Sequence, residues 1–271
     1  MPTLLELFTD PISLAFFAII LTIGGLEARF PARQLPVSRG HRARGALSLL
    51  VFFLVSSYLP YLVGPVLAPI QLADLSSLGT WAGAACAMLL YQALGYAYHR
   101  SLHRFDGLFR AVHQAHHSAE RLDVAGAFLF GPLDMVGWTL CSTLALTVLG
   151  VTPEATIVFV LGSSLLSTFQ HANLRTPRWL GYLVQRPESH SLHHARGVHR
   201  NNYADLPIFD LIFGTFENPR GFAAEAGFYD GASARVSDLL LLRDVTRPRS
   251  ACVVAQSSSQ CAEPAAVLSR R

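Results

Sequence analysis

Apolar stretches alternate with polar connections over the first two thirds of the chain. A bilayer core about 30 Å thick needs roughly 20 apolar residues in a helix. Five stretches, some of them short, approach or reach that length: residues 11–26, 46–70, 78–98, 133–151 and 155–169. The second contains Pro60, Pro65 and Pro69, so we expect it to kink near Pro60 or to end near Pro65. The pattern predicts an all-α, multi-pass transmembrane helical bundle.

Arginines mark every second connection between these stretches. The first connection, RFPARQLPVSRGHRARG, holds five arginines, the third holds four between Arg100 and Arg121, and the chain after the fifth stretch is again arginine-rich. The second and fourth connections hold none. Because positive charge is retained on the cytoplasmic side, the N-terminus is expected outside and the C-terminus in the cytoplasm.

Composition agrees with a chain that lives largely in lipid. Only 14% of its 271 residues are charged, whereas soluble domains carry about 25%. The basic residues are all arginines that lie between apolar stretches, so they indicate topology and exclude nucleic acid as a partner. The four cysteines form no CxxC pair, which excludes a disulfide framework or a cysteine zinc site. The first apolar run lacks a basic region before it, as expected for a retained helix.

We expect one membrane-embedded domain over residues 1–249, with a helical cytoplasmic cap formed mainly by 99–124 and 171–220. The Ser- and Ala-rich segment 250–271 is expected to be a disordered tail.

Nine of the eleven histidines fall into a spaced pattern, in HRSLH, HQAHH, FQHAN and HSLHH. Spacings of three and four residues put side chains on one face of a helix. Each group lies at or beyond a helix end that the arginines place in the cytoplasm, so we expect the imidazoles in one layer. The nine are His99, His103, His113, His116, His117, His171, His190, His193 and His194.

This pattern predicts a metal site. A lone histidine is more often a solvated or capping residue, and we read His41 that way because it lies among arginines. His199 lies in a turn-like segment and is expected beside the site. Two HxxHH clusters in one chain are a stronger signal. Imidazole suits iron, copper and zinc alike, and nine ligands are too many for one tetrahedral ion, so their number favours a pair.

HRSLH, HQAHH, FQHAN, HSLHH and the following NNYADLPIFDLIFGT resemble the fatty acid hydroxylase / sterol desaturase superfamily over roughly residues 20–220. The resemblance implies a di-iron enzyme, with the nine histidines as iron ligands, that uses O2 to hydroxylate or desaturate an unactivated C–H bond of a fatty acyl chain or sterol-like lipid. It implies electrons from an external NAD(P)H-linked donor, such as a ferredoxin or cytochrome b5. We expect a bacterial cytoplasmic membrane, with the histidines on the cytoplasmic side. The chemistry belongs to the metal centre, and no catalytic side chain is assigned.

The chain departs from this superfamily's pattern at two positions. Many members have an aspartate seven residues before the first motif histidine, where this chain has Gln92, and a histidine before a proline where this chain has Gly131. These departures leave the substrate open.

Five residues near the predicted histidine layer are candidates to support the ligand histidines by hydrogen bonds. The candidates are Asp210, which we favour, and His199, Asn173, Asn202 and Asp134. Asp and Asn also cluster at turns for backbone reasons alone.

A rival interpretation is a non-enzymatic membrane protein that binds metal or haem, such as a transporter or an electron carrier. Haem carriers place paired histidines at membrane depth, and transporters place ionisable residues near the midplane. Here the apolar stretches carry few of either. A visible spectrum separates the two interpretations.

Overall fold

The computed structural model describes residues 1–249. Every regular element in this range is helical, as predicted, and its sole β feature is an isolated bridge between Ala195 and Ala226. The predicted tail, 250–271, lies outside the described residues.

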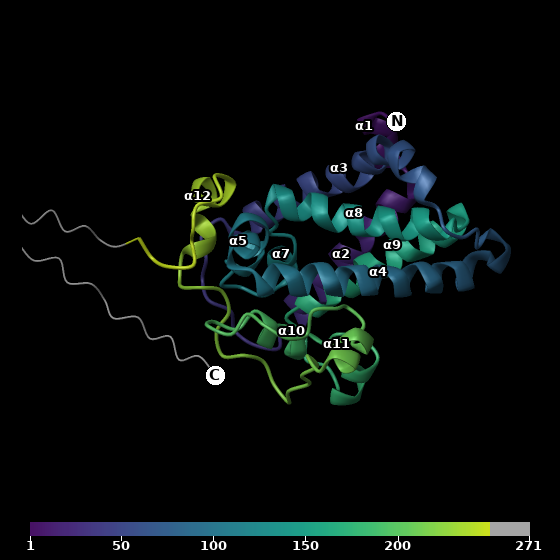
Figure 1. The fold of residues 1–271 in the computed structure, drawn as a ribbon. Coiled ribbons are helices and arrows are strands. Elements are labelled where there is room, and N and C mark those ends of the chain that lie inside the picture. Colours follow the sequence, from purple (N-terminus) through teal and green to yellow (C-terminus); the bar gives the residue numbers. More distant parts are fainter. Residues whose placement is uncertain (250–271) are drawn as a thin grey trace, which may run out of the picture.

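Five long helices form the body of the molecule and lie roughly side by side (Figure 1). Each corresponds to one of the five apolar stretches. They are α2 (Pro11–Arg29), α3 (His41–Leu67), α4 (Gly79–Arg104), α8 (Pro132–Leu149) and α9 (Pro153–His171). The central helix α4 packs against both α8 and α9.

Three helices are long and apolar enough to cross a membrane: α2, α8, and α3 together with the turn that follows it, as far as Ile70. The predicted segments at α4 and α9 are helical but do not meet the same criteria. Their sequences explain this, because α4 carries Gln92 and two histidines, and α9 carries Gln170 together with serines and threonines.

The ends of these helices follow ordinary capping chemistry. Asp10 accepts hydrogen bonds from the first backbone amides of α2, and Thr152 accepts one from Ala155 at the start of α9; each is followed by a proline at the first helical position. Gly150 ends α8 in the left-handed conformation at φ 56°. The helix α3 continues through Pro60 and ends two residues after Pro65.

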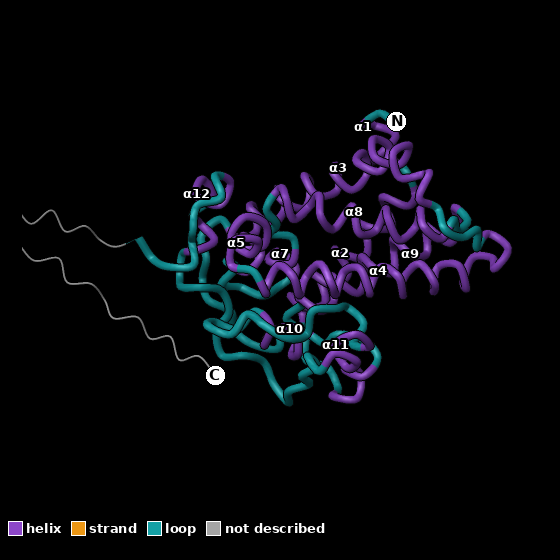
Figure 2. Tube along the Cα trace, viewed as in Figure 1, coloured by secondary structure: helices purple, strands orange, loops and turns teal. Residues whose placement is uncertain are grey.

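Short helices and loops gather at one end of the bundle (Figure 2). The α helices are α5 (Asp106–Leu108), α6 (Gln114–His117), α7 (Val124–Ala127), α10 (Pro187–His193), α11 (Ile208–Phe213) and α12 (Val236–Leu240). A π turn, η3 (Phe109–His113), joins α5 to α6. The 3-10 turns Arg178–Tyr182 and Ala232–Ala234 also lie here. The 3-10 turns Ala68–Ile70 and Ser76–Leu78 and the first helix, α1 (Leu4–Thr9), lie away from this end.

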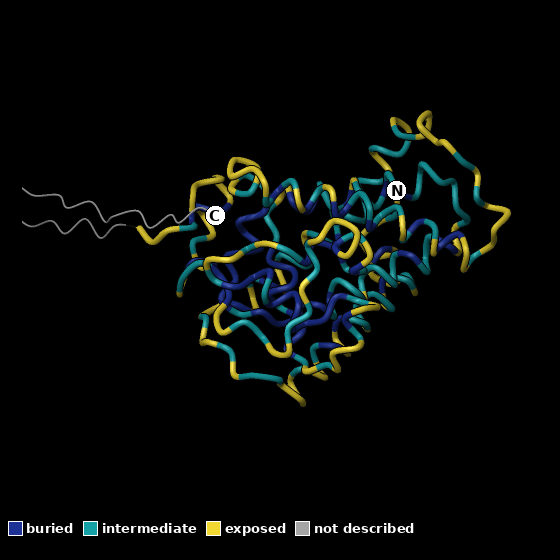
Figure 3. The backbone as a smooth tube through the Cα atoms, turned by 60° about the horizontal axis from the view of Figure 1, so that its bottom comes forward, coloured by how far each residue is buried: buried dark blue, intermediate teal, exposed yellow. Residues whose placement is uncertain are grey.

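We call the short elements at this end the cap: those from α5 to α7, and those from the turn Arg178–Tyr182 to α12. Its interior is the most continuously buried part of the chain, whereas much of the opposite end of the bundle is half-buried or exposed (Figure 3). The two segments predicted to form it, 99–124 and 171–220, do meet here. The buried centre of the cap is polar, because the histidines lie in it.

Candidate metal centre

The nine histidines predicted as ligands are brought together by four pieces of secondary structure. His99 and His103 lie one turn apart at the end of α4, and His171 is the last residue of α9. The other six come from the π turn with α6 and from α10 with the residue after it. Eight of the nine are buried and His103 is half-buried. We call these nine residues the histidine cage.

The cage divides into two groups, each with ligand atoms within 4.8 Å of one another. The larger group contains five residues: His99, His103, His113, His117 and His193. The smaller contains four: His116, His171, His190 and His194. Either group could hold a metal ion.

In the five-histidine group every ring is held through its Nδ1 atom. Three Nδ1 atoms lie 2.7 Å from backbone carbonyls, those of Tyr203, His199 and Asn201. The Nδ1 atom of His113 lies 2.6 Å from Asp134 Oδ2, and that of His117 lies 2.9 Å from Nδ1 of His199. Such partners fix the orientation of a ligating imidazole, so the Nε2 atoms are left to bind the metal.

The Nε2 atoms of this group have few partners of their own. Those of His99 and His113 lie 2.9 Å apart. Those of His103, His117 and His193 are buried and have no hydrogen-bond partner among residues 1–249. Buried polar atoms without a partner are uncommon and require an explanation, and a shared metal ion supplies one.

In the four-histidine group the Nε2 atoms converge. The distances along the series are 3.1 Å from His116 to His171, 3.0 Å from His171 to His190 and 3.2 Å from His190 to His194. A neutral imidazole carries a single N–H, so ring nitrogens packed this closely present lone pairs to a common point. Only His171 is held through Nδ1, by the carbonyl of Ser167 at 2.7 Å; the Nδ1 atoms of the other three have no partner in the described chain.

Burial keeps these imidazoles in the form that binds metal. It lowers the pKa of His190, His193 and His194 well below the ordinary value, and repulsion between neighbouring rings lowers it further. The same two causes lower the pKa of His116 and His117. These five rings are therefore neutral at pH 7, as metal binding requires.

The residues present fit a pair of transition-metal ions. Both groups consist of imidazoles alone, a donor set that suits iron, copper or zinc and disfavours magnesium and calcium. The carboxylate at the cage, Asp134, supports His113 instead of joining either group.

Of the five residues predicted to support the ligands, two touch the cage. Asp134 bonds to His113, and His199 contacts His117 through its ring and His103 through its carbonyl. Asp210, the favoured candidate, touches no cage histidine in the described hydrogen bonds. It accepts from the amides of Tyr203 and Ala204 and from the Thr215 hydroxyl, and so holds the loop whose Tyr203 carbonyl bonds to His99.

The two asparagines are structural. Asn202 donates to the carbonyl of Ser189 and accepts from the amide of Glu217, which ties α10 to the following loop. Asn173 donates to the carbonyl of Arg33. These hydrogen bonds join residues that are distant in the sequence. The sequence alone therefore could not show that the two asparagines bond elsewhere while Asp134 contacts a cage histidine.

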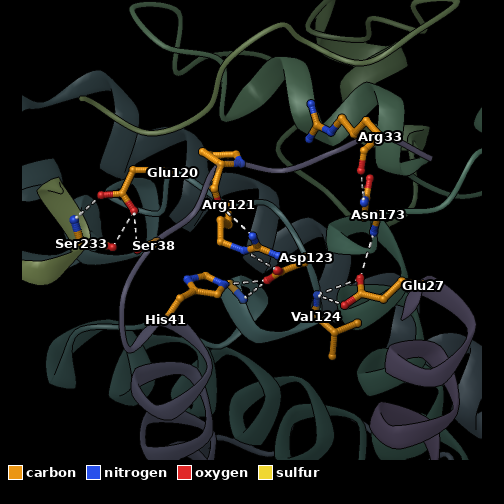
Figure 4. A network of polar contacts seen from close by, with 12 residues as sticks. Glu27, Arg33, Ser38, His41, Glu120, Arg121, Asp123, Val124, Asn173 and Ser233 are labelled. Atoms are coloured by element: carbon orange, nitrogen blue, oxygen red, sulfur yellow. Dashed lines mark hydrogen bonds and ion pairs between the residues drawn. The ribbon is translucent and has the colours of Figure 1, made fainter. Parts of the chain in front are cut away.

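The interpretation of His41 as a solvated or capping residue is wrong. Its side chain is buried, and its Nε2 atom lies 2.7 Å from Asp123 Oδ1, whose carboxylate also accepts from Arg121 (Figure 4). Neighbouring arginines suggested an exposed loop, but Asp123, 82 residues away, compensates their charge. His41 belongs to neither histidine group, as expected.

A polar cluster beside the cage was not predicted. Asp205 is half-buried and accepts hydrogen bonds from the side-chain amides of Gln92 at 3.0 Å and Gln170 at 2.7 Å. Burial raises the pKa of Asp205 to about 6. Gln92, noted as a departure from the superfamily pattern, thus has a carboxylate partner. At Gly131 an added Cβ would lie 3.2 Å from the carbonyl oxygen of Val112, so this position is tightly packed.

Known proteins are similar in sequence to the part of the chain that contains the histidine cage. Residues 84–215 match the family model described as fatty acid hydroxylase. "Very-long-chain aldehyde decarbonylase GL1-5" of Oryza sativa subsp. indica is 25% identical over 181 residues, which cover 60% of this chain and 29% of the relative. "Very-long-chain aldehyde decarbonylase GL1-9", from the indica and japonica subspecies, is 28% identical over 138 residues, covering 48% of this chain and 52% of the relative. The chain thus spans about half the length of these relatives or less. No solved structure matches.

Proposed function

We propose that this chain, a member of the fatty acid hydroxylase superfamily, is a membrane-bound, O2-dependent di-iron oxidoreductase. Its reaction is the hydroxylation or desaturation of an unactivated C–H bond in a lipid, either a fatty acyl chain or a sterol-like molecule. One observation carries the proposal: nine imidazoles converge as two adjacent groups, five and four, in the buried interior of the cap.

The residues of the chain supply position and protection. When bound, two irons would supply the O2 chemistry that abstracts hydrogen from a methylene group. The five-histidine group would hold one ion through Nε2 atoms, with rings oriented by Asp134, His199 and the backbone carbonyls of the 199–203 loop. The four-histidine group would hold the other. Burial of the cage excludes bulk water from the reacting carbon.

Three apolar helices support a membrane location. In the proposed arrangement all five long helices cross the bilayer, α4 and α9 in the protected centre, with the cap on the cytoplasmic side of a bacterial inner membrane. Electrons come from a ferredoxin or a cytochrome b5-type protein on that side. The arginine distribution supports this orientation.

The matched relatives favour a second candidate, the conversion of a long-chain aldehyde to a hydrocarbon, because their names describe aldehyde decarbonylases. In that reaction the aldehyde carbon leaves as carbon monoxide, and the hydrogen that it carried is transferred to the remaining alkyl chain. The two candidates use the same cage and differ in product.

Mass spectrometry of lipids from cells with and without the gene separates these candidates. Hydroxylation adds one oxygen to a lipid, desaturation removes two hydrogens, and the aldehyde reaction gives a hydrocarbon one carbon shorter. Unchanged lipids, together with a Soret band in the purified protein, would favour the rival haem-binding interpretation.

A further inference from the structure

A groove lies between α2 and α3 on the side of the bundle that carries the cap. The two helices touch through their aromatic side chains, where the ring of Phe53 lies 5.7 Å from that of Phe16 and 4.8 Å from that of Phe17. On the cap side of this contact the short helix α7 packs against both helices. The space that remains between them has a volume of about 740 Å³, which is within the usual range for ligand sites.

The part of the groove that follows the two long helices is apolar. Its wall includes Ile20 and Leu21 of α2, Leu49 of α3, and Phe128 after α7. Both α2 and α3 are apolar enough to cross a membrane, and Leu21 is 73% exposed. In a bilayer this wall therefore meets acyl chains.

The end of the groove nearest the cap is basic, because Arg33, Arg42 and Arg121 line it. Arg42 is exposed, and no residue among 1–249 forms a hydrogen bond or an ion pair with its guanidinium. Arg33 donates through Nη1 to the carbonyl of Ala223 and lies over the ring of Phe222 at 4.4 Å. It has no carboxylate partner in the described part of the chain, so two of the three arginines carry charges that no acid compensates.

Two carboxylates also line the groove, and both are engaged elsewhere (Figure 4). Glu27 accepts hydrogen bonds from two backbone amides at 3.0–3.2 Å. Asp123 accepts from Arg121, and its Oδ1 atom lies 2.7 Å from Nε2 of His41. Three guanidinium groups against two carboxylates leave the cap end of the groove with an excess of positive charge.

We propose that this groove binds an anionic phospholipid of the surrounding membrane, with the phosphate at Arg33 and Arg42 and an acyl chain along the apolar wall. Guanidinium groups match the oxygens of a phosphate in geometry and charge. A free phosphate would leave the apolar wall uncovered, and an uncharged lipid would leave the two arginines unpaired. The combination of a basic end and an apolar wall therefore selects a lipid with a negatively charged headgroup.

This lipid is distinct from the substrate of the proposed reaction. A cavity of about 60 Å³ lies beside the cage and is lined by His99, His113 and His171 among others. None of the described residues lines both that cavity and the groove. The bound lipid instead joins α2 to α3 where the two helices are apart. A ligand that binds only the folded chain raises its stability, so the expected role is structural.

Native mass spectrometry of the metal-free protein in detergent tests the inference without turnover. The protein is titrated with dioleoylphosphatidylglycerol, which is anionic, or with dioleoylphosphatidylcholine, which is not, and the binding constant of the first lipid is measured. One basic residue near an anionic lipid changes the affinity about 5-fold. We therefore expect the wild type to prefer phosphatidylglycerol by about 25-fold. Arg42→Gln should reduce that preference about 5-fold and leave the phosphatidylcholine constant unchanged.

Two further variants keep the test decisive. Arg39→Gln is the matched control, because Arg39 is exposed three residues before Arg42 and does not line the groove; it should bind both lipids as the wild type does. Gly25→Leu should fill the groove, since Gly25 lines it and an added Cβ there meets no atom within 4 Å. Leucine favours a helix more than glycine does, so the variant should fold and bind both lipids weakly. Thermal unfolding without lipid checks the folding of each variant.

Equal wild-type affinity for the two lipids, an equal loss in Arg39→Gln and Arg42→Gln, or unchanged binding by a folded Gly25→Leu would overturn the inference. Thermal unfolding supplies a second test, because phosphatidylglycerol should stabilise the wild type more than Arg42→Gln. Inorganic phosphate that stabilised the protein as much as the lipid does would also overturn the inference, since the acyl chains would then contribute nothing. The proposed function is tested separately, because lipid binding to the groove requires neither iron nor turnover.

Discussion

Replacing Asp134 by alanine should weaken metal binding at the five-histidine group by about 10- to 100-fold, the usual cost of losing a residue that orients a ligand. The Asp134 and His113 side chains are 0% and 1% exposed, and the carboxylate lies 2.6 Å from Nδ1 of His113. Without it, a buried N–H has no acceptor and the ring loses the contact that directs Nε2 to the metal. The expected loss equals about 1.4–2.7 kcal/mol of binding free energy.

The assay is competition for iron between the protein and a soluble chelator, with metal content measured after equilibration. Asp134→Asn is the informative companion variant, because its amide oxygen can still accept from Nδ1 and only the charge is lost. We expect it to retain metal more strongly than Asp134→Ala. In the same competition assay, His113→Ala should lose all iron from the five-histidine group.

A matched control exists in the second buried histidine–aspartate pair, His41 and Asp123, which lies outside both histidine groups. Asp123→Ala breaks a contact of similar length and should lower stability without changing iron affinity. The reasoning would be refuted if Asp134→Ala bound iron as the wild type does, or if Asp123→Ala lost iron equally, since the effect would then be general loosening of the fold.

Three further predictions concern the surroundings of the cage. His199→Ala should reduce turnover about 10- to 100-fold but keep the metal, because the His199 ring contacts His117 and is not itself a ligand. Turnover and iron content measured on the same sample check this prediction. A loss of iron as large as that caused by replacing one of the nine cage histidines would contradict it. Cysteines introduced near Arg39 and Arg196 should be protected from an external reagent in sealed membranes, and those near Leu72 and Thr152 accessible, with the reverse pattern excluding the orientation. Burial lowers the pKa of His199 to about 4 from 6.5 and lowers the pKa values of His190, His193 and His194 as well. The histidines of the unfolded chain therefore take up protons first as pH falls below about 6.5. The metal-free protein should then lose stability between pH 6.5 and 4, by at most about 1.4 kcal/mol per histidine per pH unit. Thermal unfolding measured across this range checks the prediction, and a constant stability would contradict it.

Helical spacing explains why the histidine layer could be predicted from the sequence. His99 and His103 share a face because they are one turn apart, and the positions of the apolar stretches located the five long helices. The spacing of histidines along a helix and the apolar character of a stretch are both local properties of the sequence. The division of the cage into five and four residues is not local, because His116 and His117 are adjacent in sequence and enter different groups.

Contacts between distant segments account for what the sequence did not reveal. His41 and Asp123 are 82 residues apart, and Gln92 and Asp205 are 113 residues apart. The acceptors that orient most rings of the five-histidine group are backbone carbonyls, which carry no signature of residue type. A partial signal was present in the loop itself, since Asn201 and Asn202 adopt positive φ angles that asparagine tolerates better than most residues.

The most direct test of the central claim is the number of irons per chain in the purified protein and in one variant from each histidine group. Two groups of imidazoles predict about two irons in the wild type. His193→Ala should empty the five-histidine group, and His194→Ala, its sequence neighbour, should empty the four-histidine group, each leaving about one iron. A wild-type protein with one iron or none, or two adjacent variants that both keep the full complement, would contradict a di-iron centre built from these nine histidines.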